Sequence, residues 1–101
     1  MIDDLKMSVH IKSRKEQALK ELQQIPGVGK SIAVNLWNIG IKDVKDLVGK
    51  NPGQMYEKSN RLVGAVQDRC LLYVFRCAVY YASNSVHDKE KLKWWNWKLK
   101  N

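Results

Sequence analysis

The stretch from Leu22 to Leu36 reads LQQIPGVGKSIAVNL and decides the fold. Its apolar residues recur at helical spacing on both sides of a break at Pro26, Gly27 and Gly29. We therefore expect two helices joined by a tight turn, in which both glycines adopt backbone angles that other residues disfavour. The apolar side chains expected to form the small core between these helices are Leu22, Ile25, Val28, Ala33 and Leu36.

The tight turn is expected to leave free backbone amides where the second helix opens. Such amides point outward and carry partial positive charge, so they suit an anion such as a nucleic-acid phosphate. The stretch closely resembles the helix-hairpin-helix motif, and backbone amides read charge and geometry rather than base edges. The predicted DNA-binding residues are Gly27, Val28, Gly29, Lys30 and Ser31.

The sequence lacks the residue patterns of an enzyme. Residues 29–31, Gly-Lys-Ser, end like the phosphate-binding loop of nucleotide hydrolases, but that pattern requires a glycine where Gln24 stands and a preceding strand. His10 and His87 have no partner at catalytic spacing, and no cysteine or histidine set has the spacing of a zinc site. We therefore expect no catalytic residue, no metal and no cofactor.

The composition predicts one basic domain. The chain has 101 residues with 18 Lys and Arg against 10 Asp and Glu, a net charge of +8, which favours an acidic partner such as DNA. The longest nearly apolar run, residues 70–82, contains Arg76 and is shorter than the roughly 20 residues of a membrane span. Residues 1–20 show no secretory signal, so we expect a cytoplasmic protein without a membrane partner.

Apolar residues recur at intervals of three and four through most of the chain, which predicts an all-α fold. We expect a flexible basic lead-in over residues 1–13 and a single compact helix-hairpin-helix domain over residues 14–98, similar to the sterile-alpha-motif fold. Asp43 and Asn51 are expected to cap helix starts, and Gly40 and Gly64 to end helices. About five helices are predicted, over residues 14–23, 30–39, 43–47, 51–62 and 66–83, followed by a short Trp-rich helix over residues 89–97.

The C-terminal half allows a closer comparison. Residues 68–82, DRCLLYVFRCAVYYA, and residues 92–98, LKWWNWK, resemble the pathogenicity-locus family of small bacterial helix-hairpin-helix proteins. The resemblance extends from about Leu19 to Lys98, and members often carry the label mitomycin resistance protein. It implies a fold similar to DNA-repair hairpin modules. Because mitomycin crosslinks DNA, the label implies a role linked to DNA damage.

A second basic and aromatic group lies on the predicted helix over residues 66–83. Arg69, Tyr73, Arg76 and Tyr80 are spaced to form one stripe. Two arginines among aromatic rings are suited to grip phosphates and stack on unpaired bases. The alternative, which we favour, is a solvated helix face with the arginines paired to carboxylates.

The cysteines and tryptophans are expected to serve packing. Cys70 and Cys77 share a helix face but lie roughly 10 Å apart along the axis, too far for a disulfide, and both are expected to be buried. The aromatic rings near the chain end are expected to fold back across the core. These rings belong to Trp94, Trp95 and Trp97.

The sequence thus predicts a non-enzymatic domain that binds DNA without sequence preference, as a monomer or weak dimer. The alternative is a protein-interaction adaptor in which the hairpin is purely structural. In that case Trp37, Tyr56 or the C-terminal tryptophans are the expected anchors for a protein partner.

Overall fold

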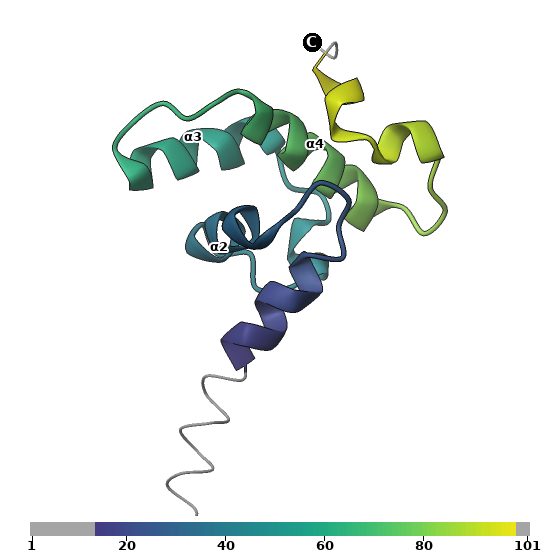
Figure 1. The fold of residues 1–101 in the computed structure, drawn as a ribbon, viewed down its shortest axis with the longest axis horizontal. Coiled ribbons are helices and arrows are strands. Elements are labelled where there is room, and N and C mark those ends of the chain that lie inside the picture. Colours follow the sequence, from purple (N-terminus) through teal and green to yellow (C-terminus); the bar gives the residue numbers. More distant parts are fainter. Residues whose placement is uncertain (1–13, 99–101) are drawn as a thin grey trace, which may run out of the picture.

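Four α-helices and three short 3-10 helices make up residues 14–98, which are the residues that the computed structural model describes (Figure 1). This part of the chain contains no strand and forms one compact all-helical domain. The predicted lead-in over residues 1–13 lies outside the described residues. The first helix covers residues 14–22. It is followed by α2 (Lys30–Asn38), η1 (Val44–Leu47), α3 (Pro52–Val63), α4 (Cys70–Ser83), η2 (Lys89–Leu92) and η3 (Trp94–Trp97).

Local capping residues set the starts and ends of the middle elements. The side chain of Asp43 accepts a hydrogen bond from the Asp46 amide (3.0 Å), and that of Asn51 accepts one from the Gln54 amide (3.1 Å). Gly64 ends α3 in the left-handed conformation at φ +80°. These caps confirm the predictions from the sequence, because each depends on residues at most four positions apart.

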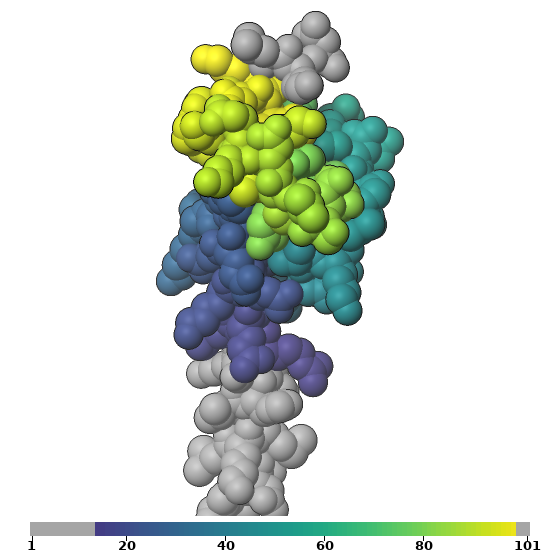
Figure 2. Space-filling model, turned by 90° about the vertical axis from the view of Figure 1, so that its right-hand side faces the viewer, coloured from purple at the N-terminus to yellow at the C-terminus, as the bar shows by residue number. Residues whose placement is uncertain are grey.

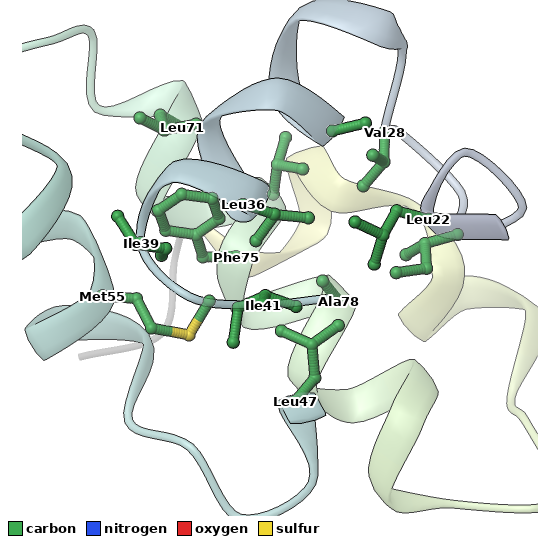
Figure 3. Packing of buried hydrophobic residues seen from close by; sticks show 13 residues of the cluster. Leu22, Val28, Leu36, Ile39, Ile41, Leu47, Met55, Leu71, Phe75 and Ala78 are labelled. Carbon is green, nitrogen blue, oxygen red and sulfur yellow. The ribbon is translucent and has the colours of Figure 1, made fainter. Parts of the chain in front are cut away.

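The core lies between the first two helices and α4. The five apolar residues of the hairpin are all buried, as predicted, and they pack in one cluster with residues of α3 and α4 (Figure 3). Phe75 and Ala78, on α4, are completely buried in this cluster. This helix is the central one, since α4 contacts α3, η1, η2 and η3.

The helix predicted from residue 66 begins only at Cys70. The backbone amide of Gln67 donates to the Asn60 side chain (3.0 Å), and the Gln67 side chain donates to Ser59 Oγ (2.9 Å). These bonds hold the segment before α4 against α3. The carboxylate of Asp68 then accepts the Cys70 amide (2.8 Å), so Asp68 performs the role of an N-cap.

The predicted Trp-rich helix is two 3-10 turns. Lys93 lies between them in an extended conformation at φ −90° and ψ 109°. Two side chains hold the turns together: Asn96 Nδ2 donates to the Glu90 carbonyl and Trp97 Nε1 to the Lys91 carbonyl, both at 2.8 Å. This C-terminal segment lies at the opposite end of the molecule from the start of the first helix (Figures 1 and 2).

None of the helices in the described part of the chain has the length and apolar character of a membrane span.

Candidate functional site

The turn between the first helix and α2 is held by its backbone and by the C-terminal segment. The Val28 amide donates to the Ile25 carbonyl (3.0 Å), and Gly27 adopts φ +85°. A Cβ atom on Gly27 would lie 2.7 Å from Cδ1 of Trp94. Gly27 therefore satisfies two demands, a left-handed backbone and close contact with an indole ring.

Gly29 differs from the expectation. Its φ of −91° and ψ of −172° are ordinary extended angles, so the prediction of unusual backbone angles is wrong for this glycine. A Cβ atom there would have no heavy atom within 4 Å. The fold does not require glycine at this position.

The start of α2 presents unpaired backbone donors. Gly29, Lys30 and Ser31 are exposed, no side chain caps the helix and no acidic residue lies in its first turn. Within residues 14–98, no acceptor is found for the backbone amides of these three residues. By contrast, Asp43, Asn51, Asp68 and Asp88 supply carboxylate or amide oxygens at other helix starts. This helix start therefore retains free donors and a positive dipole end.

Val28 is buried, unlike the residues on either side of it in the turn. Its side chain is only 5% exposed, and its amide is already bonded to Ile25. It therefore shapes the turn by packing into the core. The exposed donors of the predicted site are those of Gly29, Lys30 and Ser31, beside Gly27.

The stripe on α4 is covered by the C-terminal segment over much of its length. Arg76 Nη1 donates to the Trp97 carbonyl (2.8 Å), and the guanidinium lies 5.7 Å from the centre of the Tyr73 ring. The Tyr80 ring lies 5.6 Å from that of Trp97. Arg69 is exposed at the start of the helix. Arg76 thus bonds a carbonyl of the C-terminal segment, and much of the predicted solvated face is an internal contact.

The two cysteines lie in different environments. Cys77 is fully buried, and burial raises the pKa of its thiol to about 11. Cys70 is exposed, so the expectation that both thiols are buried is wrong for Cys70. A hydrogen bond to the Asp68 carboxylate raises the pKa of Cys70. Cys70 falls outside the core because it is the first residue of α4, at the edge of the buried helix face.

The aromatic anchors considered for a protein partner make internal contacts. Lys42 Nζ lies 3.7 Å from the centre of the Trp37 ring and donates to the Trp37 carbonyl (3.2 Å). The Tyr56 hydroxyl donates to the Gln67 carbonyl. Trp94 packs against the core, as predicted for the C-terminal rings, whereas Trp95 is 51% exposed.

A basic groove beside the hairpin was not predicted from the sequence. It lies between the first helix and the start of α2 and has a volume of about 570 Å³. We call it the basic groove, and its lining residues are Lys15, Glu16, Leu19, Lys20, Gln23 and Lys30. Helical spacing places residues 15, 19 and 23 on one ridge, but only the tertiary fold brings Lys30 to the same groove.

Comparison with known proteins identifies the family. No curated protein and no solved structure matches the chain significantly. The family described as the pathogenicity locus matches residues 15–101. This match includes the hairpin, the basic groove, α4 and the C-terminal tryptophans. The chain therefore belongs to the pathogenicity-locus family.

Proposed function

We propose that the protein is a non-enzymatic DNA-binding domain whose first helix, turn and α2 act as a helix-hairpin-helix. The observation that carries this proposal is the exposed and uncapped start of α2, where the amides of Gly29, Lys30 and Ser31 have no acceptor within residues 14–98. A backbone phosphate supplies the oxygens and the negative charge that this helix start lacks. A link to DNA damage or mitomycin resistance is part of the same proposal.

Binding through this site is independent of base sequence. Backbone amides and the Lys30 ammonium contact phosphate, while no base-reading side chain is needed. Displaced counterions make such binding weaken as salt rises. A Cβ atom at Gly29 would have no heavy atom within 4 Å, so the space beside this residue is open.

The test compares two substitutions at Gly29. Gly29→Asp places a carboxylate where it caps α2 and complements the helix dipole, so we expect the fold to be more stable by roughly 0.5–1 kcal/mol. The same carboxylate occupies the amides and repels phosphate, so DNA affinity falls. Gly29→Ala is the matched control, because its methyl group meets no atom within 4 Å and leaves the amides free.

Fluorescence anisotropy of labelled single-stranded, duplex and branched DNA, together with thermal unfolding, measures both effects. Loss of affinity in Gly29→Asp with retained binding in Gly29→Ala supports the phosphate site. Lys30→Glu is expected to weaken binding as well. Equal DNA affinity in Gly29→Asp and the wild type would overturn the proposed hairpin mechanism.

A second candidate function is a protein-interaction adaptor. Leu62 and Val63, at the end of α3, are 59% and 56% exposed, and Val66 in the following loop is 84% exposed. Neighbouring exposed apolar side chains are typical of protein contact sites. An apolar contact at this surface persists or strengthens as salt rises, whereas phosphate binding weakens, so salt dependence separates the two functions.

A further inference from the structure

We infer that the basic groove binds phosphates of a nucleic-acid strand. These phosphates are the neighbours, along the same strand, of the phosphate that binds at the start of α2. This inference rests on the proposed DNA-binding function. It extends the contact surface from the hairpin turn to the first helix. Lys30 connects the two parts, because it is the first residue of α2 and also lines the groove.

The charge of the basic groove carries the inference. Three lysines, Lys15, Lys20 and Lys30, surround it with a single carboxylate, that of Glu16. In the described part of the chain, none of these lysines lies within ion-pair distance of a carboxylate, and the ion pair found there joins Lys93 to Glu90. Three positive charges around one groove attract an anion that enters it.

The shape of the groove favours a chain of phosphates over one small anion. Its wall on the first helix extends from Lys15 to Gln23, about 12 Å at the helical rise of about 1.5 Å per residue. Successive phosphates of one DNA strand are about 3.4 Å apart along the duplex axis and farther apart along the winding strand itself, so this wall is long enough for more than one phosphate. The groove is open to solvent along this length, as a continuous strand requires.

The lysine side chains suit this ligand. Lysine ammonium groups are flexible point charges that contact phosphate without fixed geometry, so they tolerate different strand paths. Leu19 and Gln23 form the rest of the ridge between the charges. The hairpin amides hold one phosphate in defined geometry, and the lysines attract the phosphates beside it. The groove therefore increases affinity and salt dependence without adding base specificity.

The test removes two charges from the groove and two from elsewhere. Lys15→Gln with Lys20→Gln neutralises the first-helix wall and retains helix-forming side chains. Lys89→Gln with Lys98→Gln makes the same change in net charge in the C-terminal segment, which lies at the end of the molecule opposite the start of the first helix (Figure 2). Both double variants and the wild type are titrated against single-stranded and duplex DNA by anisotropy at several salt concentrations.

We expect the groove variant to lose affinity and to show a slope of log K against log salt that is less negative by about 1.8 on duplex DNA. Between about 50 and 200 mM salt, the wild type should thus lose about tenfold more affinity than the groove variant. The control pair should keep the wild-type slope. Equal losses in the two pairs would overturn the inference, because net charge alone would then explain the attraction.

The Gly29 variants separate failure of this inference from failure of the proposed function. If Gly29→Asp weakens binding and the groove pair does not, the hairpin site stands and the groove inference is overturned. If the wild type binds no DNA at low salt, both are overturned. Weakening by both changes, with the control pair unaffected, supports one continuous surface.

Discussion

At the scale of single residues, the two glycines of the turn differ in how strongly the fold constrains their positions. Gly27 is required by the fold, since φ is +85° and a Cβ atom would lie 2.7 Å from the Trp94 ring. Gly29 meets neither constraint, because its φ is −91° and a Cβ atom would have open space around it. The fold therefore tolerates a side chain at position 29, which is why Gly29→Ala serves as the control for Gly29→Asp.

Gly27→Ala is therefore expected to lower the free energy of unfolding by about 2 kcal/mol, through left-handed backbone strain and overlap with Trp94. In a Trp94→Ala background the overlap is removed and only the backbone strain of about 1 kcal/mol remains. Urea unfolding of the four proteins measures this coupling. An equal cost of Gly27→Ala in both backgrounds would show that the ring contact has no energetic role.

At the scale of elements, α4 joins the hairpin to the C-terminal segment. Cys77 marks this junction, since its Sγ lies 3.4 Å from the Leu92 carbonyl and 4.0 Å from that of Pro26. Burial among apolar side chains and carbonyl oxygens disfavours the thiolate, which is why the pKa rises to about 11.

The raised pKa of Cys77 predicts a loss of stability in alkali. In the unfolded chain the thiol ionises near its ordinary pKa of about 8.5, whereas the folded chain keeps it protonated up to about 11. Between these values the unfolded state binds fewer protons, so the free energy of unfolding falls as pH rises, by about 3 kcal/mol in total. Below the unfolded pKa this contribution is fully present.

Denaturant unfolding between about pH 8 and 11 measures this effect, and the difference between two variants isolates it. Both variants carry Cys70→Ser, because the pKa of Cys70 is also raised, by Asp68. One retains Cys77 and the other has Cys77→Ala. We expect the steeper fall only where Cys77 is retained, and parallel curves would contradict burial of an un-ionised thiol.

At the scale of the whole molecule, the proposed DNA-binding surface of one copy is small. The start of α2 and the basic groove lie at one side of a small domain, so a monomer is expected to bind DNA weakly. When two copies are linked to each other, the second copy binds the same DNA molecule in an intramolecular step once the first has bound, so the linked pair binds more tightly than one copy.

A tandem fusion of two copies through a flexible Gly/Ser linker is therefore expected to bind duplex DNA about 10²- to 10⁴-fold more tightly than the single domain. Anisotropy with DNA long enough for both copies measures the gain. A tandem in which one copy carries Gly29→Asp is the control and should lose much of it. No gain over the single domain would indicate that the two surfaces do not engage one DNA together.

Local sequence was sufficient to predict most of the helices and their ends, but not the start of α4 or the division of the C-terminal segment into two 3-10 turns. The caps at Asp43, Asn51 and Gly64 were predicted because capping depends on neighbouring residues and on backbone conformations that few residue types adopt. The buried hairpin core was predicted because helical spacing assigns Leu22 and Leu36 to facing sides. The resemblance to the pathogenicity-locus family was likewise found in two local segments, residues 68–82 and 92–98.

The sequence by itself therefore determined an all-helical domain of the pathogenicity-locus family, the hairpin core and most helix ends. Only the tertiary structure decided which surfaces remain open. Contacts between distant segments cover the α4 stripe with Trp97, place Trp94 against Gly27 and bring Lys30 beside the lysines of the first helix. Helical periodicity assigns a residue to a face of its own helix, but it carries no information about which distant segment packs on that face.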